Sequence, residues 1–481
     1  MARILFIQLN EYELHGLEAL AGELKKHGHA VRLLVRYFEK TPLREIEKFS
    51  PDIIGFPVVS SEREEVLAWA RAIKSRFHPL IVLGGIDPTF FPELIAHEAV
   101  DIVCRGEAEL AMAKLLDALD RKADYSGIEN LWVKIGGEVH RNPVGPLVEE
   151  LSQLAAPDKE IYYEPYRYFR NYPIKYFMAS RGCPFSCTYC ANQGLRELYP
   201  NRSSYLRLKT PSALLAEIKA VVHKYPVRTI GFNDDHFSHD LNWLSEFLPA
   251  YRKEVGIPFF CAGRIDQLNE DKVKALKQGG CYSLWYGLES ANPEHRAEIL
   301  GRKMSNQAIE AGMELLHRHG IITQSYNILN YPGETFQDAL ETLDYNLKLK
   351  NNFVVSSLFQ PFPGTELARQ AGLSGKGKNG KPVPSVALNY FAYSPFRQKD
   401  SAKIEKLHKL FIAAFRCRLI RRLLPLLARL PSNPLFDIIF LLSFGVDYSR
   451  VHRLTYWETI SYNIGHIRTT YLQRKARVPE N

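Results

Sequence analysis

Three of the seven cysteines lie within one short stretch, "SRGCPFSCTYCANQ", which begins at Ser180. Cys183, Cys187 and Cys190 are separated by three residues and then by two, and no fourth cysteine is near. Clustered thiolates of this kind suit two kinds of metal site. A zinc ion needs four ligands, so a distant histidine would have to complete its shell. An iron–sulfur cluster held by three cysteines would keep one iron open for another molecule.

The residues around the cysteines favour the cluster. The apolar run "IKYFMAS" predicts a strand that ends just before them, and barrel enzymes place their active sites at that end of a strand. Gly182 and Pro184 favour a loop that can wrap around a cluster. The remaining cysteines are scattered singly and form no disulfide framework, which indicates a reducing, cytoplasmic environment. They are Cys104, Cys261, Cys281 and Cys417.

The cysteine spacing, with the aromatic Tyr189 before the last cysteine, resembles the signature of radical S-adenosylmethionine (SAM) enzymes. The resemblance implies that Cys183, Cys187 and Cys190 hold a 4Fe-4S cluster whose open iron chelates the amino and carboxylate groups of SAM. It also implies an electron donor such as flavodoxin or ferredoxin. The reduced cluster would cleave SAM to methionine and a 5′-deoxyadenosyl radical, which abstracts hydrogen from the substrate.

Polar motifs follow the later strand-like runs in the same way, as "NDDH", "RID" and "LES". These segments resemble the cobalamin-associated branch of the radical SAM superfamily, although relatives commonly have glycines leading a glutamate where this chain has Asn-Asp-Asp. Such residues could also simply cap helices. The SAM-binding residues that the resemblance implies are Tyr189, Asp234, Asp235, Arg264, Glu289, Ser290 and Asn327.

The first 120 residues alternate buried strand-like runs with amphipathic helical stretches, which predicts a doubly wound, flavodoxin-like parallel sheet. Two short strands around Gly136 and Gly137 predict a hairpin at about residues 129–141. We therefore expect a first domain over residues 1–145. A polar stretch containing prolines, residues 146–172, is interpreted as a linker.

Two motifs of this first domain, "VLGGIDPT" and "VDIVCRGEAE", fall at strand ends. Paired glycines let a large planar ligand approach the backbone, but they can equally form a tight strand-to-helix turn. Next to the radical SAM signature, the motifs resemble a cobalamin-binding domain. The Asp-x-His-x-x-Gly motif is absent and His15 has the wrong spacing, so cobalamin would lack a histidine ligand. The cobalamin-binding residues implied are Ser60, Gly84, Gly85, Asp87, Arg105, Gly106 and Glu107.

Six further strand-and-helix units predict a radical SAM partial (β/α)6 barrel over residues 173–375. Residues 376–481 are predicted to be mainly helical and basic. From residue 401 onward there are 14 Lys and Arg against 5 Asp and Glu, so this tail carries the whole net charge of +9. Its helices could lie on anionic lipid as a peripheral contact, or cover the barrel by packing, which we favour. No nucleic-acid-binding module is recognised.

The sequence therefore predicts a cobalamin-dependent radical SAM enzyme, most simply a methyltransferase acting on an unactivated carbon. The substrate would be a hydrophobic, lipid-like or natural-product small molecule. An anaerobic oxidative cyclase or rearrangement enzyme, resembling the one that acts on a magnesium-protoporphyrin ester, is the alternative of the same architecture. A non-catalytic metal-binding or redox-sensing protein is an alternative of another class.

Overall fold

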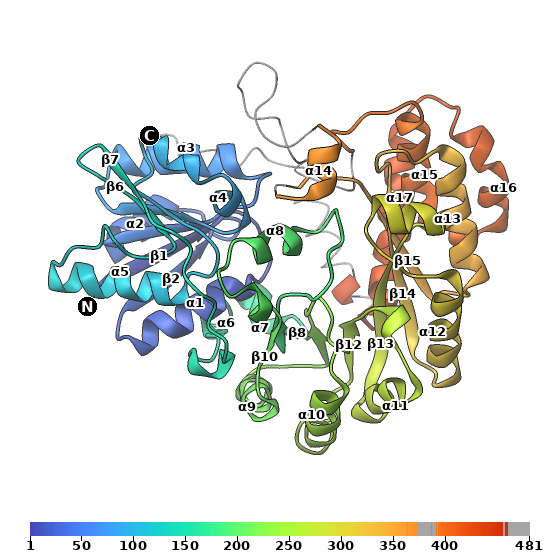
Figure 1. Ribbon diagram of the computed structural model, residues 1–481, viewed down its shortest axis with the longest axis horizontal. Coiled ribbons are helices and arrows are strands. Elements are labelled where there is room, and N and C mark those ends of the chain that lie inside the picture. Colours follow the sequence, from blue (N-terminus) through green and yellow to red (C-terminus); the bar gives the residue numbers. More distant parts are fainter. Residues whose placement is uncertain (363, 373–385, 387–390, 392, 456, 460–481) are drawn as a thin grey trace. The chain divides into compact units, whose positions relative to one another are not determined.

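The computed structural model describes residues 1–362, 364–372, 386, 391, 393–455 and 457–459. These residues form two compact units (Figure 1). The first consists of Met1–Tyr172 with Gly194–Pro226, and the second of Pro173–Gln193 with the described residues from Val227 to Thr459. Each unit is built around its own sheet.

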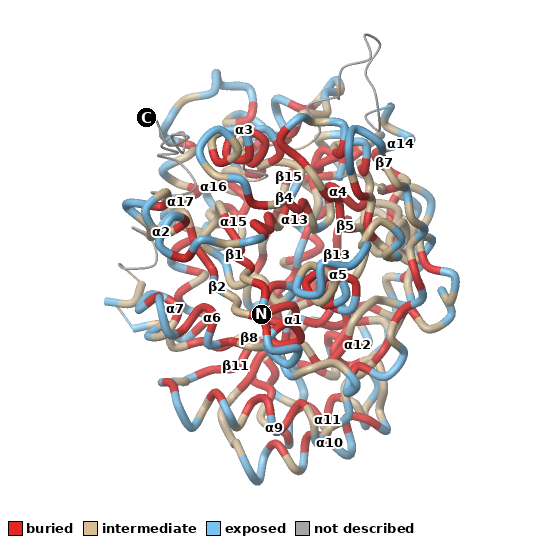
Figure 2. Tube along the Cα trace, turned by 90° about the vertical axis from the view of Figure 1, so that its left-hand side faces the viewer, coloured by how far each residue is buried: buried red, intermediate tan, exposed pale blue. Residues whose placement is uncertain are grey.

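The sheet of the first unit has seven strands in the order β2-β1-β3-β4-β5-β6-β7. Strands β1 to β5 are parallel, in the 2-1-3-4-5 order of flavodoxin-like folds, which confirms the predicted fold class. Their apolar runs are buried, as parallel strands covered on both faces require (Figure 2). The strands are β1 Arg3–Gln8, β2 Ala30–Val35, β3 Ile53–Pro57, β4 Leu80–Gly84, β5 Ile102–Cys104, β6 Leu131–Ile135 and β7 Glu138–Arg141.

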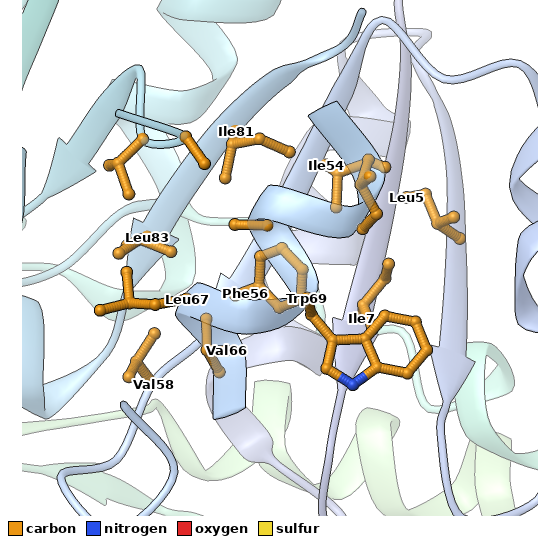
Figure 3. Close-up of a cluster of buried hydrophobic side chains, with 14 of the residues drawn as sticks. Leu5, Ile7, Ile54, Phe56, Val58, Val66, Leu67, Trp69, Ile81 and Leu83 are labelled. Carbon is orange, nitrogen blue, oxygen red and sulfur yellow. The ribbon is translucent and has the colours of Figure 1, made fainter. Parts of the chain in front are cut away.

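Helices cover this sheet, and α3 places the fully buried Trp69 against Ile7 and Phe56 of the strands (Figure 3). The helices around this sheet are α1 His15–Lys26, α2 Pro42–Phe49, α3 Arg63–Lys74, α4 Ile86–Phe90 and α5 Glu109–Arg121, whereas α9 Pro211–Val222 belongs to the later segment Gly194–Pro226. The short strand β10, Arg207–Leu208, precedes α9.

The predicted hairpin is formed by β6 and β7, and Gly136 and Gly137 between them both have positive φ, as a tight two-residue turn requires. Residues 146–172, interpreted above as a linker, contain two short helices, α6 Glu160–Tyr163 and α7 Arg167–Asn171. The Tyr162 hydroxyl donates a hydrogen bond of 2.6 Å to Oε1 of Gln8. This segment therefore packs against the first sheet, and its aromatic side chains are buried.

The second unit holds six parallel strands in the order β15-β14-β13-β12-β11-β8, the predicted partial barrel. They are β8 Ile174–Phe177, β11 Thr229–Phe232, β12 Phe259–Ala262, β13 Cys281–Glu289, β14 Ile322–Leu329 and β15 Phe353–Leu358. Side-chain caps begin most of the helices between them, including a capping box at Thr335 and Asp338. The helices are α10 Leu241–Glu254, α11 Glu270–Gly279, α12 Asn306–Arg318, α13 Phe336–Lys348 and α14 Glu366–Gln370, and the cysteine loop lies between β9 Ser180–Arg181 and α8 Ala191–Glu197.

Aromatic side chains line the inner face of this half-barrel. The rings of Phe260 and Trp285 stack with centroids 4.2 Å apart, and the ring of Tyr326 meets Trp285 edge-on at 6.1 Å. Tyr326 lies on β14, between two neighbouring strands, yet 36% of its surface is exposed. The inner face is thus largely aromatic at this position and partly open to solvent, and Gln324 on the same face of β14 donates to the Tyr326 hydroxyl at 3.0 Å.

Among the described residues, three helices follow the barrel: α15 Ser401–Arg416, α16 Arg418–Leu427 and α17 Pro434–Val451. Helix α15 buries its predicted apolar residues, among them Leu407 and Phe411, against Leu343 of α13 and Leu358 of β15. The packing interpretation is therefore correct for α15. None of the described helices combines the length and apolar character that crossing a bilayer demands.

Candidate functional site

The cysteine loop leaves the carboxyl end of β8 through Gly182, whose φ is +83°. Thr188 fixes the middle of the loop, because its hydroxyl donates to the carbonyl of Ile299 at 2.6 Å and its carbonyl accepts from the backbone of Leu367 at 2.8 Å. At Gly301 a Cβ atom would lie 3.0 Å from the carbonyl of Ser186, so only glycine admits this close approach. The cysteine loop is thus held by the segments that follow β13 and β15.

Burial and hydrogen-bond donors shape the chemistry of the three thiols. Burial raises the pKa of the Cys183 thiol to about 11 and also raises the pKa of Cys190. The amide of Asn192 points at the Cys190 sulfur from 3.5 Å, and the guanidinium of Arg302 lies 3.9 Å from the Cys187 sulfur. Donors so placed stabilise thiolates once a metal has removed their protons. The loop therefore fits an iron–sulfur cluster.

Within the described ranges, no three His, Cys, Asp or Glu side chains are close enough to hold one metal ion. A 4Fe-4S cluster does not need such a group, because each thiolate binds its own iron atom. His236 and His239 approach to a ring separation of 5.5 Å without a third ligand of this kind in the described chain.

A buried polar cluster joins the cysteine loop to the end of β13. The Tyr189 hydroxyl donates to Oε1 of Glu289 at 2.9 Å, and Arg302 donates to the same hydroxyl at 3.0 Å and forms an ion pair with Glu289 at 3.7 Å. Burial raises the pKa of Glu289 despite this cation. Glu289 also has a φ of +65°, a strained conformation of the kind that gathers at functional sites. Sequence reasoning missed Arg302, which belongs to no recognisable motif.

The two aspartates after β11 have different surroundings. Asp234 is buried, and its carboxylate accepts hydrogen bonds from the backbone of Ala179 at 3.1 Å and from the backbone and hydroxyl of Ser180 at 2.5 Å. It thereby fixes the start of the cysteine loop. Asp235 is exposed and accepts from Asn192 at 2.9 Å, beside the Cys190 sulfur. Asp235 is the one placed to meet a ligand.

Unsatisfied polar groups lie next to this loop. Both ring nitrogens of His236 and the hydroxyl of Ser238 are buried and have no hydrogen-bond partner in the described part of the chain. The ring of His236 lies 5.9 Å from that of Phe185. The guanidinium of Arg264 stacks on the Phe185 ring at 3.9 Å and also donates hydrogen bonds to Asp266. Burial lowers the pKa of His236 to about 3, so the imidazole is neutral. Such orphaned groups fit a polar ligand such as SAM.

The last two predicted SAM-binding residues are bound by protein groups. Ser290 is buried, and its hydroxyl lies 2.8 Å from that of Tyr331. Asn327 accepts from Asn346 of α13 at 2.9 Å and donates to the carbonyl of Val355 at 3.0 Å. Because Asn327 faces the helix layer, its neighbour Tyr326 faces the inner side of the sheet.

In the first unit, Ser60 and Asp87 contact each other at the carboxyl ends of β3 and β4. Asp87 is fully buried; it accepts from the Ser60 hydroxyl at 2.6 Å and from both ends of the Arg63 guanidinium at 2.7 Å. Gly85, with a φ of +100°, is required by the turn, since a Cβ would lie 2.9 Å from the carbonyl of Val58. A Cβ on Gly84 would meet nothing nearer than 4.0 Å. Of these two glycines, Gly84 is the one that leaves open space for a planar ligand.

The segment after β5 is likewise held internally. Glu107 forms an ion pair with Arg207 at 2.5 Å, and the hydroxyl of Tyr199 accepts from the Glu107 backbone at 2.9 Å. Gly106 admits this tyrosine, because a Cβ there would lie 2.5 Å from its hydroxyl. Arg105 stacks on Trp132 at 5.6 Å. These contacts hold the loop that follows the carboxyl end of β5.

The same unit has exposed apolar groups in the loops after β1 and β3, where ligands of parallel sheets bind: Tyr12 is 54% exposed and Val59 is 40% exposed. Such groups suit a large planar ligand such as a corrin. His15 is engaged elsewhere, with its Nδ1 2.9 Å from Oε2 of Glu18. That carboxylate also binds the buried Lys159 at 2.7 Å.

Two family profiles match the chain. The radical SAM superfamily matches residues 178–345, which contain the cysteine loop and most of the half-barrel, and the B12 binding domain matches residues 10–116. The chain belongs to the cobalamin-binding radical SAM superfamily. The predicted family and the two predicted cofactor-binding domains are confirmed.

Two relatives and one solved structure are similar to this chain over most of its length. An uncharacterized methyltransferase of Pyrococcus horikoshii is 27% identical over 363 residues, covering 73% of this chain and 77% of the relative. The anaerobic magnesium-protoporphyrin IX monomethyl ester cyclase of Rubrivivax gelatinosus is 25% identical, covering 77% and 70%. The radical SAM methyltransferase TsrM of Kitasatospora setae, solved with cobalamin and a 4Fe-4S cluster, has the same fold, with a TM-score of 0.68, 17% identity and coverage of 99% and 100%.

Proposed function

We propose that this protein is a cobalamin-dependent radical SAM methyltransferase that methylates an unactivated carbon of a hydrophobic or natural-product small molecule. The observation that carries the proposal is the cysteine loop at the carboxyl end of the first barrel strand, in a chain that also has a B12-binding domain. When bound, the cluster would supply the electron that cleaves SAM, and cobalamin would supply the methyl group.

The residues of the chain have separate tasks in this proposal. Cys183, Cys187 and Cys190 hold the cluster, and Asp234 fixes the loop that carries them. Asp235 receives the amino group of SAM, because it is the exposed carboxylate beside the Cys190 sulfur. His236 and Ser238 supply further polar contacts to SAM, since both are unsatisfied within the described structure.

The inner wall of the half-barrel supports a hydrophobic substrate. Phe260, Trp285 and Tyr326 form a continuous aromatic surface. The ring of His452 packs on Phe260 and Trp285, so the exposed part of this surface is Tyr326. Aromatic faces bind apolar or planar molecules and exclude water from a radical reaction. An electron donor such as flavodoxin or ferredoxin would reduce the cluster.

The first experiment uses the full chain after anaerobic reconstitution with iron, sulfide and cobalamin. With SAM and a reductant, we expect 5′-deoxyadenosine from the wild type and from Cys417→Ala, an exposed cysteine outside the loop. Cys187→Ala should form none and retain less iron. If the wild type forms no 5′-deoxyadenosine, a metal-binding or redox-sensing role replaces the enzyme.

The cyclase-like relative gives a second candidate, an oxidative cyclisation or rearrangement. SAM with a labelled methyl group separates the two reactions. A methyltransferase moves the label into product, whereas a cyclase forms product without label. The assay can use extracts of the native cells as the source of substrate.

A further inference from the structure

A series of exposed apolar side chains continues along α16, through the following turn and along α17. Their exposed fractions range from 39% for Leu423 to 65% for Leu442, and their spacing of three or four residues keeps each set on one side of its helix. We call the exposed residues of both helices and the turn between them together the α16–α17 face. It consists of Leu419, Leu423, Leu426, Leu430, Leu435, Ile438, Leu442 and Val446.

These eight residues are a large share of the exposed apolar side chains, since the described chain exposes only nineteen large hydrophobic side chains to this degree. The opposite sides of the two helices already have partners: Leu424 and Phe436 are buried with α15 in one apolar cluster. The helices are therefore held in place by packing, and the exposed face is not needed for it. Clusters of exposed apolar side chains on a folded protein are typical of interaction sites.

The charges around the face are positive. Arg418, Arg422 and Arg429 are exposed, and none has a carboxylate within ion-pair distance among the residues that the structure describes. The acidic residues of α17 are already neutralised, Asp437 by Lys409 at 2.7 Å and Asp447 by Arg416 at 2.8 Å. The face thus combines aliphatic side chains with arginines that form no ion pair with a carboxylate of the described residues.

We propose that the α16–α17 face docks on a membrane surface that contains anionic lipid. Leucine and isoleucine facing outward beside arginines are the composition of helices that lie in the lipid headgroup region. Each arginine near an anionic bilayer adds to binding, while the apolar side chains enter the boundary of the acyl chains. A second copy of the chain fits less well, because a symmetric contact would bring the same arginines together.

The test measures binding of the full-length, anaerobically purified protein to sedimented vesicles. Vesicles of phosphatidylcholine with phosphatidylglycerol are compared with vesicles of phosphatidylcholine alone, and no turnover is required. We expect binding to the anionic vesicles that weakens with added salt. Leu419→Ser, Leu426→Ser and Leu442→Ser together should lower the partition coefficient by about tenfold or more.

Matched variants separate the apolar and charge contributions to vesicle binding from effects that any surface substitution would have. Replacing Arg418, Arg422 and Arg429 by Gln should lower binding about fivefold per arginine. Replacing the exposed Lys48, Lys114 and Arg121 of the first unit by Gln should change it little. The exposed Leu110→Ser is the apolar control.

Two results would overturn the proposal. One is the absence of vesicle binding by a monomeric wild type. The other is a dimer in sedimentation experiments that the three leucine variants dissociate, which would assign the face to a second copy. Both results leave the proposed methyl transfer untouched, because that reaction is measured through SAM cleavage and label transfer.

Discussion

The guanidinium of Arg302 lies 3.9 Å from the sulfur of Cys187, although the two residues are 115 positions apart in the sequence. The same guanidinium forms an ion pair with the buried Glu289 and donates to the hydroxyl of Tyr189. A positive charge beside a cluster ligand stabilises the more negative, reduced cluster. Arg302 therefore links the sulfur of Cys187 to the carboxylate of Glu289 at the end of β13.

We expect Arg302→Met to lower the reduction potential of the cluster and to reduce the rate of SAM cleavage by about 10- to 100-fold. The apo-protein should also lose about 3 kcal/mol of stability, because Glu289 is left buried without its cation. The double variant with Glu289→Gln should regain most of that stability but not the potential. Redox titration followed by electron paramagnetic resonance, with urea unfolding, separates the two effects; an unchanged potential in both variants would refute the electrostatic role.

The pair Asp234 and Asp235 offers a matched comparison. Asp234→Asn places an amide against three donors, so it should cost about 1–3 kcal/mol in the free energy of unfolding and weaken iron loading. Asp235→Asn is exposed and should change stability by less than about 0.5 kcal/mol. It should instead weaken SAM binding, measured by equilibrium dialysis with the reconstituted protein. Equal SAM affinity in wild type and Asp235→Asn would contradict the assignment.

Local sequence signals predicted the strands and the cysteine loop well. Buried parallel strands appear in the sequence as continuous apolar runs, and the three cysteines proposed to hold the cluster lie close together in the chain. The contacts of Arg302 could not be predicted in this way, because they depend on how distant segments meet. Nor could the orientation of Asn327, since a strand gives alternate residues opposite faces and both faces of β14 carry polar groups.

The two glycines of "VLGG" have different roles. Gly85 is required by the backbone turn, whereas Gly84 leaves open space at the carboxyl end of β4. Gly84→Val should therefore fold but block the approach of a corrin, so that corrinoid absorbance no longer copurifies with the protein. Gly127→Val, which also adds a side chain in open space of the first unit, should retain the absorbance. Loss of absorbance in both variants would point to misfolding instead.

The buried pair of Glu18 and Lys159 ties the segment after the hairpin to α1, and it predicts a pH dependence of stability. Burial alone would raise the pKa of Glu18, but the charges of Lys159 and His15 outweigh it and lower the pKa from 4.5 to about 2. Because the folded pKa is depressed, the ionised carboxylate stabilises the fold above about pH 4.5, and this contribution is lost as the pH falls toward 2.

Between about pH 6 and pH 3 the wild type should therefore lose roughly 2 kcal/mol more stability than the double variant Glu18→Gln, Lys159→Met, which has no charge to titrate there. Urea unfolding of the first unit, followed by hydrogen exchange in the full chain, measures the difference at each pH. The double variant keeps the packing of the site while removing both charges, so parallel pH profiles for the two proteins would show that this ion pair does not hold the segment 146–172 against α1.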